Sequence, residues 1–419
     1  MNLRLRRLVR RMRPQPWQRN FYPILAAEVV AMIGFSISVP FLPFYIQELG
    51  ITRLSEVALW VGLINSVAPI SMAVASPIWG MVADRVGRKP MLVRAMLGGG
   101  LILGLMSAVA NVPQLAILRI IQGTLTGTVP AATALVATSV PRERTAFALG
   151  LLQTVIYIGN TLGPFLGGIL GGVFSYRAVF LTAGMLLSLA GVLVLLLVQE
   201  EFEAPPPRQR AGNPLASTAR SVAGEPVLVT MLSLLMLNSL GNMVTTPILP
   251  LYVQTLVPTA KAASTATGWV VGATAFSNAL SAVWVGRWAD RLGRRRVLLT
   301  CLGLAAAIHF PQMFTRHPAQ LLVLRVMLGL ALGGVIPVAN AIIAERAPQD
   351  HQGGVYGISH GLNATGRALG PMLGTLVVTH WQIGGVFPVT GTLLGLLAIV
   401  TAIRTRDVPA RGAVPARRG

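Results

Sequence analysis

The sequence predicts an all-α integral membrane protein in which twelve transmembrane helices form two pseudo-symmetric six-helix bundles. Hydrophobic residues make up 53% of the 419 positions and charged residues only 11%, a composition too apolar for a soluble globule. Apolar runs long enough to cross the roughly 30 Å hydrocarbon core alternate with short polar gaps. The motif GMVADRVGRK at 80–89 returns as GRWADRLGRR at 286–295, which indicates two homologous halves.

Other sequence matches between the two halves support a duplication. PFLPFY at 40–45 is matched by PILPLY at 247–252, and Arg119 by Arg325. The apolar runs then predict six helices in each half. We expect them at 21–46, 57–82, 91–110, 114–139, 145–172 and 176–198, and again at 225–257, 263–288, 297–315, 319–344, 352–379 and 382–403.

Three regions follow from this pattern. Residues 1–198 are expected to form the first bundle with a basic tail, and residues 225–419 the second bundle with another basic tail. Residues 199–224 between them contain three glutamates, a run of three prolines and several arginines. Such a polar, proline-broken stretch is typical of a linker, which we expect in the cytoplasm.

The basic residues indicate the orientation in the membrane. A formal charge of +21 raises the question of nucleic acid, but the lysines and arginines lie in the short gaps between apolar runs, so we expect no nucleic-acid partner. Loops on one side hold most of them, and the opposite loops hold only Arg53, Arg177, Lys261 and Arg316. Because basic loops stay inside, both termini are expected in the cytoplasm of a multi-pass cell-membrane protein.

The chemistry of an enzyme is missing from the sequence. Cys301 is the single cysteine, which excludes an internal disulfide and a cysteine metal site. There is no metal-ligand cluster, no phosphate-binding glycine loop and no nucleophile with a base at usable spacing. We therefore expect no enzyme, no metal and no cofactor, and an energy source that is either an ion gradient or the substrate's own gradient. We also expect a monomer.

The motifs taken together resemble those of the major facilitator superfamily, in particular its twelve-helix drug:proton antiporters. The loop GMVADRVGRK matches a family signature, LRIIQG at 118–123 resembles the helix 4 signature, and GNTLGPFLGG at 159–168 resembles that of helix 5 in proton-coupled antiporters. Gly34 with Pro40 and Pro43 resembles the helix 1 signature of the drug exporters. The resemblance covers the whole chain.

The charged loops are expected, by this resemblance, to latch the cytoplasmic ends of the halves in the outward-facing state. An aspartate at a helix end can accept from the amino terminus of a facing helix, and a following arginine can pair with an acid after helix 4. The alternative is that the basic residues serve topology alone. The expected latch residues are Asp84, Arg85, Arg88 and Glu143, with Asp290, Arg291 and Arg294 as their mirror.

Helix 5 carries closely spaced glycines. Gly159, Gly163 and Gly167 recur at every fourth position and form one smooth face, with Pro164 and Gly168 beside it. We expect this face to pack against Gly268 and the glycine at 272 on helix 8, across the two halves. The alternative is ordinary small-residue packing, and the antiporter implication comes from the resemblance alone.

One acid lies inside a predicted span. Glu28 is expected in helix 1 near the cytoplasmic side, where a carboxyl alternates between neutral and charged if its surroundings change. Its alternative is an interfacial acid paired with Arg94 or Arg367. Arg119 matches the family arginine associated with proton transfer, although its repeat Arg325 also allows an architectural role.

A substrate site is expected near the midplane, between the halves. The pocket would be largely apolar, which suits small amphipathic or lipophilic compounds. Its candidate lining residues are Met32, Phe35, Asn65, Gln122, Tyr157, Asn238, Asn242, Phe276, Asn340 and Asn363.

The leading hypothesis is a proton-coupled exporter of such compounds, resembling multidrug efflux proteins and working by rocker-switch alternating access in the lipid bilayer. Two alternatives stay open. One is a lipid or lysolipid translocase, or an uncoupled facilitator, of the same fold. The other is a membrane receptor or scaffold that transports nothing.

Overall fold

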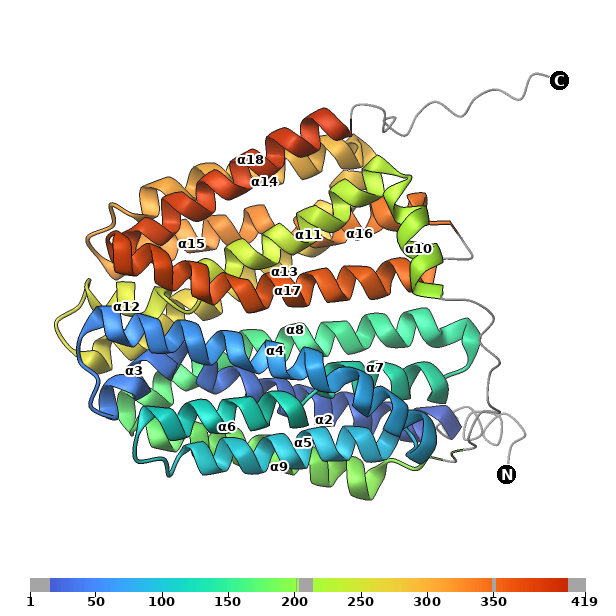
Figure 1. Cartoon of the computed structure of the whole chain (residues 1–419), viewed down its shortest axis with the longest axis horizontal. Helices are drawn as coiled ribbons and strands as arrows, with labels where there is room; N and C mark the ends of the chain where they lie inside the picture. Colours follow the sequence, from blue (N-terminus) through green and yellow to red (C-terminus); the bar gives the residue numbers. More distant parts are fainter. Residues whose placement is uncertain (1–15, 201, 203–213, 349–351, 406–419) are drawn as a thin grey trace, which may run out of the picture.

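The computed structural model describes residues 16–200, 202, 214–348 and 352–405, and shows two stacked helical bundles whose helices run along the long axis (Figure 1). The first bundle consists of α2 (Pro16–Ser38), η1 (Val39–Phe41), α3 (Leu42–Glu48), α4 (Leu54–Val86), α5 (Arg88–Met106), α6 (Val112–Leu125), α7 (Thr128–Ser139), η2 (Arg142–Arg144), α8 (Thr145–Val173) and α9 (Tyr176–Leu197). The second consists of α11 (Pro226–Thr245), α12 (Leu249–Gln254), α13 (Ala260–Leu292), α14 (Arg294–Gln312), α15 (Pro318–Leu332), α16 (Val335–Arg346), α17 (Gln352–His380), η4 (Ile383–Gly385) and α18 (Val386–Arg404).

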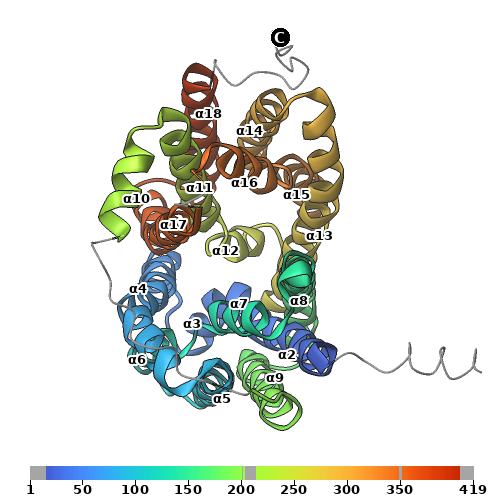
Figure 2. The same cartoon turned by 90° about the vertical axis from the view of Figure 1, so that its right-hand side faces the viewer.

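The described chain forms the two expected bundles, with six helical rods in each. Ten stretches of the described chain are long and apolar enough to cross a membrane by themselves. The other two rods are α14, which begins with three arginines, and α17, which is rich in glycine and polar residues. Both belong to the second bundle (Figure 2), where α14 packs against α18 and α15, and α17 against α11.

Four predicted rods are interrupted, which is a difference from the sequence expectation. The helices expected at 21–46 and 225–257 break at η1 and before α12, and those at 114–139 and 319–344 break between α6 and α7 and between α15 and α16. At the α6–α7 break Gly127 has φ of +131°, which only glycine adopts readily. The breaks occur at corresponding places in both halves, so they belong to the repeated unit.

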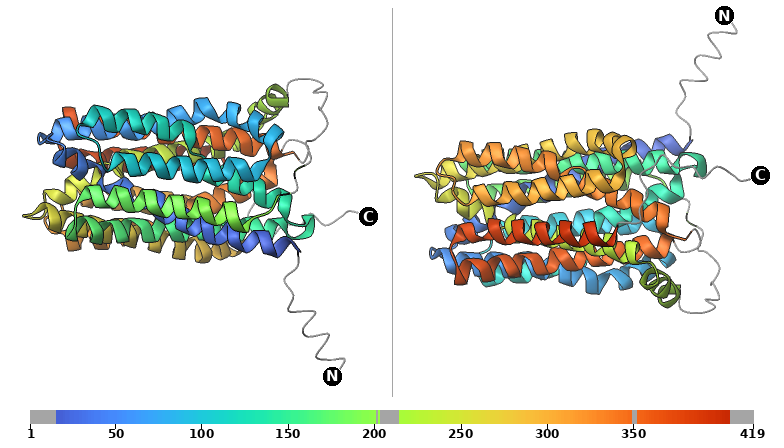
Figure 3. Two further views of the ribbon diagram at one scale, coloured as in Figure 1. Left: turned by 90° about the horizontal axis from the view of Figure 1, so that it is seen from below. Right: turned by 90° about the horizontal axis from the view of Figure 1, so that it is seen from above.

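The region expected as a linker contains a helix. Residues 214–223 form α10 (Pro214–Ala223), which contacts α17 and α11 and stands at the side of the molecule (Figure 3). This segment can form a short helix because α17 and α11 cover one side of it, and the glycine at 224 follows directly after its end. The proline run of the linker lies outside the described residues.

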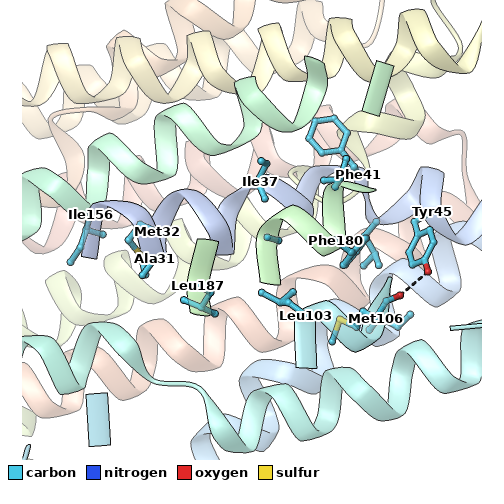
Figure 4. Close-up of a cluster of buried hydrophobic side chains, with 14 of the residues drawn as sticks. Ala31, Met32, Ile37, Phe41, Tyr45, Leu103, Met106, Ile156, Phe180 and Leu187 are labelled. Atoms are coloured by element: carbon cyan, nitrogen blue, oxygen red, sulfur yellow. Dashed lines mark hydrogen bonds between the residues drawn. The ribbon is translucent and has the colours of Figure 1, made fainter. Parts of the chain in front are cut away.

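The packing inside each bundle repeats as well. In the first bundle the Tyr45 hydroxyl donates to the carbonyl of Met106 at 2.7 Å, and its ring lies 4.8 Å from that of Phe180 (Figure 4). In the second, Tyr252 donates to the carbonyl of Gln312 at 2.9 Å and lies 4.8 Å from Phe387. Each tyrosine therefore ties the short helix after the break to its own bundle.

Candidate functional site

The two bundles touch along two pairs of helices, α4 with α17 and α8 with α13 (Figure 2). We call the end where α2 begins and α18 ends the basic end, and the opposite end, with the loop 49–53, the far end. The hydroxyl of Ser264 donates to the carbonyl of Gly168 at 3.4 Å, and that of Thr375 to the carbonyl of Ala58 at 2.7 Å. In the described residues every side-chain hydrogen bond between the bundles lies toward the far end.

This distribution of contacts defines the conformational state. Toward the basic end, side chains on both helices are exposed. Tyr157, which precedes the contact region on α8, is 49% exposed, and Phe276, which follows it on α13, is 62% exposed. The described chain is therefore closed between the halves at the far end and separated at the basic end.

Glu28 is the buried acid of the first bundle. It lies in α2 with 0% of its surface exposed, and neither carboxyl oxygen has a hydrogen-bond partner. The alternative pairing with Arg94 or Arg367 is not found. The Arg94 guanidinium instead lies 3.6 Å from the centre of a Trp79 ring, and Arg367 is exposed. Glu28 is thus an acid without an ionic partner among the described residues.

Arg119 is buried in α6, with one guanidinium nitrogen bonded and two free. Its Nη1 donates to Oε1 of Gln122 at 3.0 Å, whereas Nε and Nη2 have no partner. Arg325 in α15 repeats this burial and leaves the same two atoms without a partner. The position that corresponds to Gln122 is Leu328, so the amide partner belongs to the first half alone.

The candidate substrate residues fall into three groups by exposure. Among them, Asn363 accepts from the Ser239 hydroxyl at 2.6 Å and Asn242 accepts from that of Thr246 at 2.8 Å, so both already have partners within one bundle. Met32 packs against Gly159. The buried members are Met32, Gln122 and Asn238, the half-buried ones are Phe35, Asn65, Asn340 and Asn363, and the exposed ones are Tyr157, Asn242 and Phe276.

The helix 5 glycines face a different neighbour from the one expected. Gly159, Gly163 and Gly167 pack against α2 within the first bundle, and not against α13. The contact with Gly268 is made by Gly168, where a Cβ would lie 2.7 Å from the Gly268 Cα. Adjacent residues on a helix point about 100° apart, so a one-residue step turns from one neighbour to the other. Pro164 lies inside α8 beside the same contact.

The two charged loops differ in their partners. In the second half, Arg294 lies 3.6 Å from Asp290 and 2.9 Å from Glu345, an acid near the end of α16. In the first half, Arg88 lies 3.4 Å from Asp84, and the described residues show no ion pair between Arg88 and Glu143. No ion pair in the described chain involves Glu143, Arg85 or Arg291.

Glu200 takes the place expected for Glu143. Its carboxylate accepts the backbone N–H of Arg88 at 2.9 Å and that of Lys89 at 2.7 Å. These are the first N–H groups of α5, which have no partner inside the helix, and a carboxylate there also meets the positive end of the helix dipole. Each charged cluster lies within its own half. An ionic latch between the halves therefore stays a prediction for the state that is closed at the basic end.

Replacing Glu200 with alanine should lower the free energy of unfolding by about 1–2 kcal/mol, because the two amide groups that it caps lose their acceptor. The thermal unfolding of the purified protein in detergent measures this loss. Glu56 pairs with the exposed side chain of Arg53 and with no other cation in the part of the chain that the structure describes, so it provides the matched control. Glu56→Ala should change little. An equal loss in both variants would show that the cap contributes nothing.

Sequence reasoning missed two residues at the far end. Gln47 and Gln254 join the bundles through their side-chain amides. The sequence contains a signal for this pair. The matching segments PFLPFY and PILPLY extend to PFLPFYIQ and PILPLYVQ, so that each half has a glutamine at the same position of the repeat.

The duplicated bundles and the apolar spans define a multi-pass membrane protein built of two like halves. The family model of the Major Facilitator Superfamily matches residues 24–257 and 231–419. The multidrug resistance protein MdtG of Escherichia coli (strain SMS-3-5 / SECEC) is 30% identical over 398 residues, which covers 94% of this chain and 97% of that protein. The chain belongs to the major facilitator superfamily.

Solved structures share the fold. A bacterial homolog of the human lysosomal transporter Spinster, in an inward-facing and unoccupied conformation, aligns with a TM-score of 0.73 at 14% identity, over 92% of this chain and 96% of that one. The human organic anion transporter MFSD10 (TETRAN) aligns with a TM-score of 0.66 at 16% identity, over 93% of this chain and 100% of that one. At these identities the similarity concerns the fold alone.

Proposed function

We propose that this protein exports small amphipathic or lipophilic compounds in exchange for protons, by alternating access of the rocker-switch type. The observation that carries the proposal is Glu28, a fully buried acid whose two oxygens have no hydrogen-bond partner. The name of the relative MdtG, a multidrug resistance protein, supports the substrate class. The overall similarity to that protein extends along nearly the whole chain.

The environment of Glu28 suits an exchange of protons. An ionised carboxylate in an apolar interior is costly when nothing pairs with it, whereas the protonated acid carries no charge. Glu28 can therefore hold a proton while it is enclosed and release it where water or a cation reaches it. A cationic or zwitterionic substrate that approaches the carboxylate then competes with the proton for one site.

The orientation follows from charge. The basic end carries the arginine-rich loops, which stay in the cytoplasm of multi-pass proteins, so the separated halves open to the cytoplasm in this state. The contacts of Gly168 with Gly268 and of Gly62 with Thr375 allow the backbones to approach closely on both sides of the molecule. We propose that the bundles pivot on these two contacts.

Transport by the purified protein in proteoliposomes tests the proposal. A panel of lipophilic cations and neutral amphipathic compounds is followed with and without an imposed pH gradient. Accumulation that requires the gradient is the expected result. Movement that ignores the gradient would favour the uncoupled facilitator or the lipid translocase, and no movement of any compound would favour the receptor or scaffold.

A further inference from the structure

One pair of side chains joins the two bundles at the far end, between the two lateral contacts. The Gln47 amide nitrogen donates to Oε1 of Gln254 at 2.9 Å, and the Gln254 amide nitrogen donates back to Oε1 of Gln47 at 3.0 Å. The two residues are 207 positions apart, which is the offset that relates the halves of the sequence. The same residue of each repeat therefore contacts its own counterpart.

The pair is held rigidly, because each glutamine lies on a short helix that is tied to its own bundle. Gln47 is on α3 and Gln254 on α12, and these two helices contact each other. Tyr45 anchors α3 to the end of α5, and Tyr252 anchors α12 to the end of α14. Since neither helix can follow the opposite bundle, a movement of the bundles apart at the far end must break both amide hydrogen bonds.

The surroundings of the pair are open on one side. Gln47 and Gln254 are half-buried and line a hollow of about 430 Å³ together with Thr52, Leu54 and Thr255. The segments before both glutamines are buried. The two amides thus lie at the boundary between the closed interior and the space on the far side.

The lateral contacts are of another kind. Ser264 and Thr375 donate to backbone carbonyls of the opposite bundle, and a glycine of the first bundle lies against each of them, Gly168 against Ser264 and Gly62 against Thr375. Those contacts are the pivots proposed above, about which the bundles rotate. The glutamine pair is made by side chains alone and is the part that can separate.

We propose that Gln47 and Gln254 form the gate clasp of the far side, which holds the export pathway closed while the basic end is open and separates when substrate is released. This inference rests on the proposed alternating access, and it assigns to these two residues the closing of the outer gate. The clasp acts through the conformational equilibrium and touches no substrate.

Spin labels across the far end test the clasp. Arg53 on the first half and Lys261 on the second are exposed, Arg53 just before α4 and Lys261 at the start of α13, both at the far end. With Cys301 replaced by alanine, Arg53→Cys and Lys261→Cys carry the labels, and electron–electron distance measurements in lipid nanodiscs report the closed and open populations. The clasp variants are Gln47→Leu, Gln254→Leu and the two combined.

We expect each single variant to shift the ratio of closed to open molecules about tenfold toward open, because both hydrogen bonds are lost at once. The double variant should shift the ratio no further than either single variant, since the bonds are shared. Gln320→Leu is the matched control, because this far-end glutamine bonds to the backbone of Arg316 within one bundle. Its populations should equal those of the parent.

Unchanged populations in the single variants, or shifts that add in the double variant, would overturn the clasp. The distance measurement requires neither substrate nor a pH gradient, so it is independent of the proposed export. A shifted equilibrium in a protein that shows no gradient-driven transport would overturn the proposed function and leave the clasp standing.

Discussion

Replacing Glu28 with glutamine should reduce gradient-driven transport to the level seen without a gradient. Glutamine has nearly the same size as glutamate but cannot release a proton. Because both oxygens of Glu28 lack partners in the described structure, the substitution breaks no hydrogen bond that the fold requires. Proteoliposomes with an imposed pH gradient measure the effect, and the thermal unfolding of the variant shows that it is folded.

A matched control separates this effect from a general loss of acid. Glu56→Gln removes an exposed carboxylate at the far end, whose partner Arg53 is also exposed. It should transport as the parent does. If Glu28→Gln retains full gradient-driven transport, Glu28 is not the proton carrier and the coupling must use another group.

Replacing Gly168 with valine should reduce transport at least tenfold, although the protein should still fold. A Cβ at this position would lie 2.7 Å from the Gly268 Cα and 3.1 Å from the carbonyl of Ser264. Both are backbone atoms, which cannot rotate away, so the bundles must move apart at the far end. The spin labels at positions 53 and 261 should then report a larger separation.

Two further variants define what the Gly168 result means. At Gly104 on α5 an added Cβ meets nothing within 4 Å, so Gly104→Ala should transport normally. Gly163→Val instead collides with Ser36 inside the first bundle and should lower the unfolding temperature. If Gly168→Val lowers that temperature as much as Gly163→Val does, the contact with Gly268 supports folding and is not a pivot.

Much of the site could be anticipated from single residues, but their partners could not. Glu28 was recognisable because an acid inside an apolar run is rare, and its burial agrees with that expectation. The partner of Arg88 was not, since Glu200 and Glu143 are both acids that follow a helix on the same side of the membrane. Glu200 reaches the start of α5 because the chain that leaves α9 passes beside it, which only the tertiary structure shows.

The glycines of α8 illustrate the same limit. Their spacing shows that one face is smooth, but a smooth face fits α2 as well as α13. Which helix it meets depends on the rotation of α8 about its axis, and neighbours in space set that rotation. A single step from Gly167 to Gly168 changes the contact from within a bundle to between bundles.

The sequence by itself determined the class of this protein. Its apolar runs require a bilayer, its basic loops orient the spans, and its repeated motifs require two like bundles, because each of these properties depends on residue types along the chain. The tertiary structure decided which end is closed, which backbone contacts join the bundles, and that Gln47 meets Gln254. Those facts depend on how the two bundles are placed against each other, and residues about half a chain apart become neighbours only after that placement.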